Sequence, residues 1–297
     1  MSYARMIALT SLAMLAFAGN SLLCRMALTQ TRIDAASFTT LRLISGALML
    51  WLVVQRHRRT QTGRGNWRSA LALFIYAAAF SFSYQGLTAA TGALLLFGAV
   101  QATMISHGIL QGERLTRLEL LGLAMALAGL IGLLLPGLSA PPLYNSLLML
   151  MAGMAWGVYS LRGKGIGDPT RVTAGNFLRA VAFAAALSVL MFKGASVDRA
   201  GFGYAVASGA LASGLGYAIW YTALPALKAT QAATVQLSVP IIAAFGGVVF
   251  LGEAISLRLV LTSIIILGGI ALVIAQRQQN QRTATPNKVA ARSGEQA

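Results

Sequence analysis

Ten apolar stretches follow one another along this chain, and they constrain its fold more than any other feature of the sequence. Each is about 20 residues long, the length at which a helix crosses a hydrocarbon core of ~30 Å. The chain is also only 10% charged, whereas a soluble globular protein averages about a quarter. The sequence therefore predicts an all-α integral membrane protein. The expected helices cover 5–25, 35–54, 69–88, 91–110, 117–135, 143–161, 171–192, 201–222, 229–250 and 257–276.

Two of these boundaries need an argument. Residues 5–25 are apolar after Arg5, as a cleaved signal peptide would be. They include Asn20 and continue into Arg25 without a small-x-small cleavage site, which favours a first transmembrane helix. The division of 69–110 into two helices depends on a very short connection, "LTAATG".

The basic residues indicate how the helices are oriented. With ten spans, sixteen of the 23 Lys and Arg residues fall in the loops and termini of one side and five on the other, while Arg42 and Arg179 fall inside spans. This bias follows the positive-inside rule and predicts that both termini are cytoplasmic. The net charge of +16 therefore reports topology, and we expect the lipid bilayer, not nucleic acid, as the partner.

The two halves of the sequence repeat each other. Residues 76–136 align without a gap on 216–276, which places the Gly112-Glu113 pair on Gly252-Glu253 and Gly129 on Gly269. Only seven residues of the chain are acidic. Two of them lie in the repeated Gly-Glu pair, which indicates that the same helix–helix connection occurs once in each repeat. We interpret Gly as the end of one helix and Glu as an anion at the start of the next; a gating role for the Glu is the alternative.

An odd number of spans per repeat inverts the second copy in the membrane. Residues 1–138 are then the first five-helix repeat, 139–276 the second, inverted one, and 277–297 a polar tail that we expect to be disordered and cytoplasmic. Inverted repeats are typical of secondary transporters, in which one half moves against the other around a central cavity.

These features resemble the EamA type of the drug/metabolite transporter superfamily. The resemblance covers about residues 5–276 and includes Ala226-Leu227, Thr230, Pro240 and Gly252-Glu253, although the first copy has Val100 in place of Pro240. Within the family the chain is most similar to bacterial aromatic amino acid exporters. The resemblance implies a bacterial inner-membrane protein, a cavity that opens alternately to each side, and peripheral fifth and tenth helices.

Arg42 and Arg179 are the strongest single candidates for the substrate site. They occupy equivalent positions in the two repeats. An arginine inside the membrane is costly and usually faces a cavity or a partner. A guanidinium would suit a substrate carboxylate, but both residues could instead snorkel or bind helix-end carbonyls.

Aromatic and amide side chains supply the remaining candidates. Tyr76, Phe80 and Tyr84 form a one-face stripe in the third span, matched by Tyr217, Trp220 and Tyr221 in the eighth. Such groups suit a flat, mostly neutral ligand, although core packing or an interfacial belt would use the same residues. The predicted substrate-binding residues are Asn20, Arg42, Tyr84, Gln85, Trp156, Tyr159, Arg179, Trp220, Tyr221 and Gln236.

The absence of certain residue patterns excludes several functions. No predicted span contains Asp or Glu in its interior, which argues against a carboxylate-driven proton exchanger. With one cysteine and two distant histidines, we expect no metal site, and no cofactor or catalytic constellation is legible. A channel would need a ring of polar groups as its selectivity filter, and the sequence shows none. We therefore expect a transporter that exports small metabolites, with aromatic or neutral amino acids as first candidates and other metabolites or drugs as the alternative.

Overall fold

The computed structural model describes residues 3–56, 63–112, 115–137, 140–163, 168–227 and 235–294, and these are folded into helices. The first repeat comprises α1 (Tyr3–Gln30), α2 (Ala35–Arg56), α3 (Trp67–Ser83), α4 (Ala89–Leu110) and α5 (Arg117–Leu134). The second comprises α6 (Leu143–Arg162), α7 (Pro169–Leu190), the short η1 (Phe192–Gly194), then α8 (Arg199–Val206), η2 (Ala207–Leu215), α9 (Gly216–Ala223) and η3 (Leu224–Ala226), and finally α11 (Ser238–Leu251) and α12 (Leu257–Gly294).

The ten predicted spans are confirmed. The segments α8, η2, α9 and η3 follow one another without a break and form the single eighth span, Arg199–Ala226. Seven of the ten described spans are long and apolar enough to cross a membrane by themselves, α3 and α11 are shorter apolar helices, and α6 has 20 residues but is less apolar than the seven. The predicted division into α3 and α4 is present, but the connection is residues 84–88, so it starts earlier than the predicted "LTAATG" and α3 is shorter than the expected span 69–88. Pro240 lies in the first turn of α11, just after a turn at Leu237 that separates α11 from the helical residues 235–236; a proline has no N–H to continue the helical hydrogen bonds through this point.

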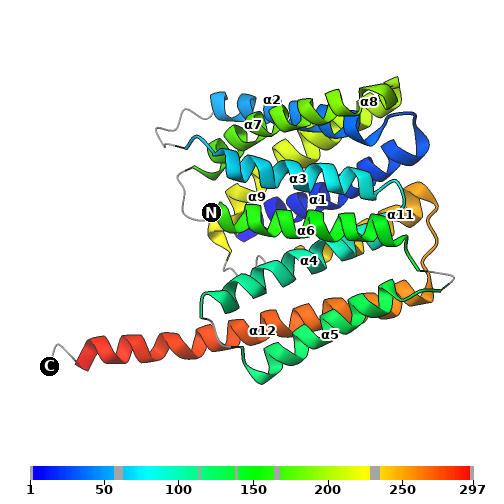
Figure 1. Cartoon of the computed structure of the whole chain (residues 1–297). Coiled ribbons are helices and arrows are strands. Elements are labelled where there is room, and N and C mark those ends of the chain that lie inside the picture. The colour runs from blue at the N-terminus through cyan, green and yellow to red at the C-terminus, as the bar shows by residue number, and fades with distance from the viewer. Residues whose placement is uncertain are drawn as a thin grey trace.

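The helices pack as two related halves. Helices α3 and α4 of the first half pack against α6 of the second, and η2, α9 and α11 of the second half pack correspondingly against α1 of the first. Other contacts join equivalent helices, α2 with α7, α4 with α11 and α5 with α12, and the contacts of α2 with α8 and η2 correspond to that of α7 with α3. This is the pairing that a two-fold relation between inverted repeats produces. Both termini lie at one end of the bundle, which we call the N/C end, opposite the far end (Figure 1).

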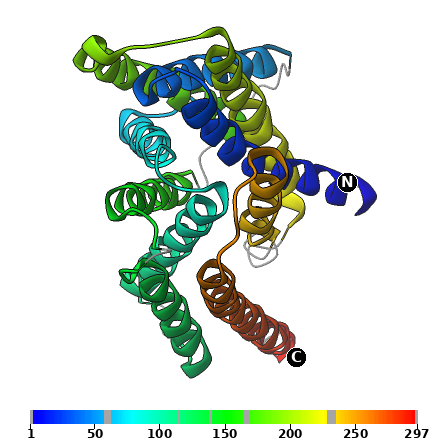
Figure 2. The ribbon, with the colours of Figure 1, turned by 90° about the vertical axis from the view of Figure 1, so that its right-hand side faces the viewer.

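Helices α5 and α12 form a pair at the edge of the bundle (Figure 2). They cross where Gly122 meets Gly269, and a Cβ on either glycine would meet the main-chain carbonyl oxygen of the other. Small residues allow this close approach, which stabilises helix pairs in lipid through main-chain packing. The crossing ties the last helix of one half to the last helix of the other.

The repeated Gly-Glu phrase has the predicted turn but a different electrostatic role. Gly112 and Gly252 both have positive φ, at 88° and 63°, and end their helices. The following helices are capped by Thr116 and Ser256, whose side chains accept main-chain N–H bonds. The prediction that Glu253 serves the start of α12 is therefore wrong, since its carboxylate accepts the N–H of Ala89 at the start of α4; Glu113 lies outside the described residues.

The last helix continues into the segment for which the sequence predicts a disordered tail, and that tail stays a prediction. The backbone of α12 stays helical past the span end at 276, as far as Gly294. Arg, Gln and Ala are good helix formers, and adding residues to an existing helix avoids the cost of nucleation. This accounts for a helix that continues beyond the packed bundle.

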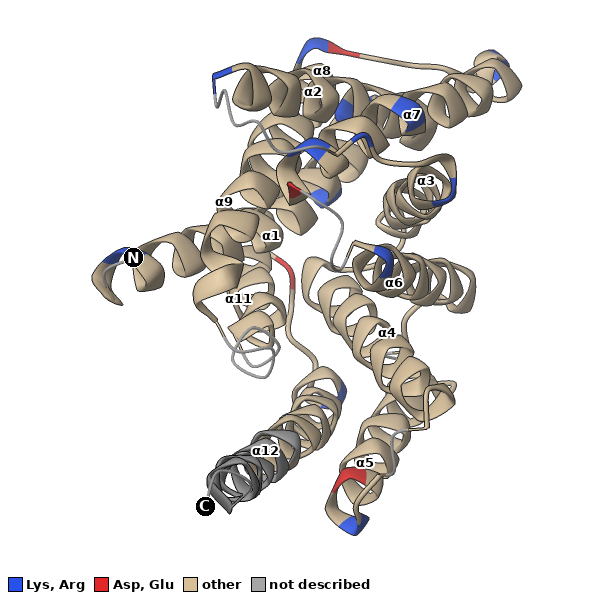
Figure 3. Cartoon of the chain, turned by 90° about the vertical axis from the view of Figure 1, so that its left-hand side faces the viewer, with Lys and Arg blue, Asp and Glu red and all other residues tan. Residues whose placement is uncertain are grey.

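Charged residues lie mainly at the helix ends and connections, and the helix bodies are mostly uncharged (Figure 3). Arg56, Arg68, Arg117 and Arg162 lie at the N/C end, as the ten-span topology requires. That this end faces the cytoplasm remains a prediction from the positive-inside rule.

Candidate functional site

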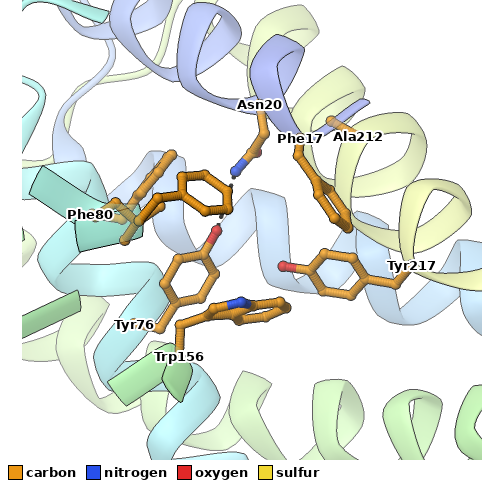
Figure 4. Close-up of a pocket in the computed structure, with 9 residues that line it drawn as sticks. Phe17, Asn20, Tyr76, Phe80, Trp156, Ala212 and Tyr217 are labelled. Carbon is orange, nitrogen blue, oxygen red and sulfur yellow. Dashed lines mark hydrogen bonds between the residues drawn. The ribbon is translucent and has the colours of Figure 1, made fainter. Parts of the chain in front are cut away.

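An aromatic cavity lies between the two halves of the bundle. Its volume is about 20 Å³ in this conformation, room for about one water molecule. Helices from both repeats contribute, so the cavity lies where relative movement of the halves would open it. Its lining consists of Phe17, Asn20, Tyr76, Phe80, Leu96, Phe97, Trp156, Ala212 and Tyr217 (Figure 4).

The rings of the cavity wall contact one another across the repeat boundary. Trp156 of α6 lies 4.9 Å from Tyr76 of α3 and 5.0 Å from Tyr217 of α9, measured between ring centroids. Phe17 of α1 packs edge-on against Tyr217 at 5.8 Å. Four helices thus present aromatic surface to one small volume, which suits an apolar or aromatic ligand.

The hydroxyl of Tyr76 is the polar centre of this wall. It accepts hydrogen bonds from Arg42 Nη2 at 3.0 Å and from Asn20 Nδ2 at 3.3 Å. The Tyr217 hydroxyl points toward it across the cavity (Figure 4). A hydroxyl has two acceptor lone pairs and one hydrogen to donate. With both lone pairs used, Tyr76 can act toward a ligand only as a donor.

Arg42 is fully buried directly behind the aromatic wall. Its side chain is 1% exposed, and its guanidinium carbon lies 5.2 Å from the ring centre of Tyr76 and 4.9 Å from that of Phe80. Nε donates to Ser213 Oγ at 3.3 Å, whereas Nη1 is buried without a hydrogen-bond partner among the described residues. Within that part of the chain no carboxylate contacts Arg42, so its charge is held by hydroxyls and π faces alone.

A π-helical segment supplies the hydroxyls around this arginine. In η2, Ser208 Oγ donates to Asn20 Oδ1 at 2.7 Å, and Ser213 accepts from Arg42. The wider i→i+5 turn of a π-helix brings residues five apart onto one face, and π segments often occur at functional sites. Gly209 between them allows the close approach, because a Cβ there would collide with Ser45 and with the main chain of Arg42.

Arg179, the repeat equivalent of Arg42, has different surroundings. Its Nη1 donates to the main-chain carbonyls of Arg64 at 2.6 Å and Gly175 at 2.8 Å, and its guanidinium lies 5.9 Å from the ring centre of Trp67. These contacts tie α7 to the connection that precedes α3 at the N/C end. The arrangement matches the alternative of a helix-end tether.

The other predicted residues divide into those that line the cavity, those that pack behind its lining and those that lie elsewhere. Asn20 and Trp156 line the cavity. Tyr159 packs on Trp156 at 5.5 Å, and Trp220 packs on Phe17 at 6.0 Å, both behind the lining. Tyr84, toward the far end, also lies behind the lining, with its ring 4.8 Å from that of Phe80. The remaining three lie away from the cavity: Gln85 in the turn after α3, Tyr221 beyond Trp220 on α9, and Gln236 just before α11.

Several lining residues were outside the predicted set. Tyr76, Phe80 and Tyr217 belong to the aromatic stripes noted in the sequence, but the stripes alone do not say which ring faces inward. Phe17 lies three residues before Asn20, so helical spacing places it on the same face of α1. Phe97 has no comparable sequence signal, because α4 is apolar on every side.

A wider groove opens toward the N/C end. It has about 1280 Å³ of empty space and runs between the first half of α1 and the start of α11. Its walls include Met6, Thr10, Met14, Val235 and Ile242. Since Met14 is less than one turn from Phe17, the groove reaches close to the aromatic cavity from this side.

Two inverted five-helix repeats around a central cavity are the architecture of secondary transporters of the membrane. The EamA-like transporter family model matches residues 4–135 and 144–275, one match in each half. The chain belongs to this family. The matched boundaries coincide with the division into α1–α5 and α6–α12.

Relatives agree with this assignment. The chain is 60% identical to an uncharacterized protein of Pseudomonas aeruginosa, over 92% of this chain and 96% of that one. It is 24% identical to the uncharacterized transporter YoaV of Bacillus subtilis, over 78% and 85% of the two chains. A solved crystal structure, 19% identical, has the same fold with a TM-score of 0.65 over 92% of this chain and 98% of the other.

Proposed function

We propose that this protein is an inner-membrane secondary transporter that exports small metabolites by alternating access, with aromatic and other neutral amino acids as substrates. The observation that carries the proposal is Arg42, a buried cation beside an aromatic cavity with no carboxylate contacting it in the described chain and with an unpartnered Nη1. A mid-membrane arginine costs ~2.5–3.5 kcal/mol on insertion scales. Arginines that are kept inside a membrane at this cost commonly belong to functional sites.

A substrate carboxylate would supply the missing negative charge. It would accept from the Tyr76 hydroxyl and, once the rings separate, approach Arg42, which the Tyr76 and Phe80 rings cover in this conformation. The rings of Phe17, Trp156 and Tyr217 would pack on the apolar part of the substrate. The residues therefore match a molecule with one acidic end and one flat apolar end.

The acidic residues give little support to proton-driven exchange. Those that the structure describes, Asp34, Glu119, Asp168, Asp198 and Glu253, all lie in a helix's first turn or in a connection. A proton-coupled carrier of the usual kind holds a carboxylate at membrane depth. Facilitated movement, or coupling through another group, fits these residues better.

The test is counterflow in proteoliposomes with an aromatic amino acid and with its amide. Arg42→Gln should reduce transport of the acid at least tenfold, corresponding to ~1.4 kcal/mol, and reduce transport of the amide much less. Arg42→Lys should recover part of the loss, because lysine keeps the charge but lacks the planar guanidinium that can bind both oxygens of a carboxylate. Arg179→Gln is the matched control, since that residue binds main-chain carbonyls at the N/C end.

Equal loss for acid and amide in Arg42→Gln would show that Arg42 has a structural role, and the carboxylate proposal would fail. A panel of other metabolites and drugs in the same assay tests the alternative substrate classes. Transport of uncharged drugs alone, unchanged by Arg42→Gln, would favour a drug exporter.

A further inference from the structure

An ion pair joins four segments at the far end of the bundle. Arg25 Nε lies 3.0 Å from Glu253 Oε1, and Glu253 Oε2 accepts the main-chain N–H of Ala89 at 2.8 Å. Arg25 Nη1 also donates to the carbonyls of Tyr84 at 2.8 Å and Gln85 at 3.2 Å. The pair therefore connects the end of α1, the turn after α3, the start of α4 and the connection from α11 to α12.

This cluster lies between the aromatic cavity and the far end. Arg25 follows the cavity residue Asn20 by five residues, about 7.5 Å along a helix. Tyr84 follows the cavity residue Phe80 by one turn, and its ring packs against Phe80 at 4.8 Å. The side chains of Arg25 and Glu253 are only 18% and 11% exposed. Such partial burial weakens screening by salt.

At the opposite end, the repeat equivalent of Glu253, Glu113, lies outside the described residues, but the equivalent arginine is described. The offset that relates Arg42 to Arg179 also relates Arg25 to Arg162 at the end of α6. Arg162 Nε donates to a neutral group, Ser69 Oγ, at 3.2 Å. The wide groove between α1 and α11 lies at that same N/C end. The groove therefore makes the N/C end the more open end of this conformation.

We propose that Arg25 and Glu253 form a latch that closes the transport path at the far end and must separate before substrate leaves there. The inference rests on the proposed function, since alternating access requires one end to close while the other opens. The ion pair, the α4 N-terminus that binds Glu253 and the two carbonyls on Arg25 favour the closed arrangement. Breaking the pair would shift the equilibrium toward opening at this end.

The chain contains a reporter for this movement. Cys24 is its only cysteine and is 0% exposed. It lies four residues after Asn20, so it shares the inward face of α1 between the cavity and Arg25. A thiol reagent entering from the far end has to pass the latch to reach it.

The experiment measures how fast a membrane-impermeant maleimide, added only at the far end of oriented proteoliposomes, modifies Cys24 without substrate. Glu253→Gln keeps an oxygen for the Ala89 N–H but removes the charge, and should increase the rate about tenfold, a ~1.4 kcal/mol population shift. Arg25→Gln should do the same. Arg162→Gln should leave the rate unchanged, and Cys24→Ser should remove the signal.

Unchanged labelling in folded Glu253→Gln and Arg25→Gln would overturn the latch. If these variants do not fold, Arg25→Lys replaces them. Lysine keeps the charge but lacks the guanidinium, whose Nε binds Glu253 while Nη1 binds the carbonyls of Tyr84 and Gln85. Arg25→Lys is expected to raise the labelling rate about threefold. Faster labelling of Arg162→Gln to the same extent would also overturn the proposal, because it would indicate general loosening. Since no substrate is present, a failed latch is distinguishable from a wrong substrate, which only the Arg42 transport assay detects.

Discussion

Arg42 and Arg179 occupy equivalent positions in the two repeats but have opposite surroundings. Arg42 donates to the Tyr76 hydroxyl inside the aromatic core, while Arg179 donates to the main-chain carbonyl of Arg64 at the N/C end. The difference is one of neighbours: Tyr76 and the π-helical serine Ser213 face Arg42, and a chain connection faces Arg179. Sequence symmetry therefore does not imply a symmetric site. A substrate bound at Arg42 would lie off the two-fold axis that relates the two repeats.

Two tryptophans should respond differently to truncation. Trp156 lines the cavity, so Trp156→Ala should weaken transport of aromatic substrates with little change in melting temperature. Trp220 is 7% exposed and packs behind Phe17. Trp220→Ala should therefore destabilise the fold by ~3–5 kcal/mol. Thermal unfolding in detergent and transport per folded molecule separate the two effects; similar behaviour of both variants would contradict the cavity boundaries.

The α5–α12 crossing should depend on Gly269. Gly269→Ala places a Cβ against the Gly122 carbonyl, and overpacking of this kind costs ~1–3 kcal/mol. The adjacent Gly268 is the matched control, because a Cβ there meets nothing within 4 Å. Gly268→Ala should leave the melting temperature unchanged or raise it slightly, as alanine favours a helix. A lower melting temperature for Gly268→Ala than for Gly269→Ala would disprove the crossing.

Membrane orientation follows from charge and is open to direct measurement. In a Cys24→Ser background, Ala254→Cys at the far end should react with an impermeant thiol reagent from the periplasm. Arg68→Cys at the N/C end should react only after the membrane is opened. Both positions are exposed. The reverse labelling pattern would mean that the positive-inside count predicts the wrong orientation.

The connection between α1 and α2 should make stability depend on pH. Burial raises the pKa of Asp34, but hydrogen bonds from Ser37, Ser196 and Ala36 outweigh it and hold that pKa below its ordinary value of 3.8. A carboxyl with a lowered folded-state pKa stabilises the fold above the unfolded-state pKa and loses this contribution as the pH falls through the folded-state pKa. Wild type should exceed Asp34→Asn in melting temperature at pH 7.

That difference should shrink below about pH 4 and nearly vanish once Asp34 is protonated. Thermal unfolding of both proteins in the same detergent across this range is the measurement. A constant difference at all pH values would show that the Asp34 charge contributes nothing and that only the shape of the side chain matters.

The sequence by itself determined the ten spans, their division into two inverted halves, and the turns at Gly112 and Gly252. These follow from local physics: the hydrocarbon thickness sets the helix length, and a positive φ favours glycine. It also singled out Arg42, Asn20 and Trp156, because polar or aromatic groups at membrane depth are few.

Only the tertiary structure decided which of the candidates meet. Gln85 and Gln236 have the same chemistry as the lining residue Asn20 but lie at the bundle ends, Tyr84 packs behind Phe80, and Arg179 reaches a main-chain carbonyl. The partner of Glu253 is Arg25, 228 positions away, and the π-helical turn that presents Ser213 to Arg42 has no distinct sequence pattern. The physical reason is that lipid-facing and cavity-facing surfaces of these helices are equally apolar, so periodicity does not reveal which face turns inward; packing between distant helices sets that rotation.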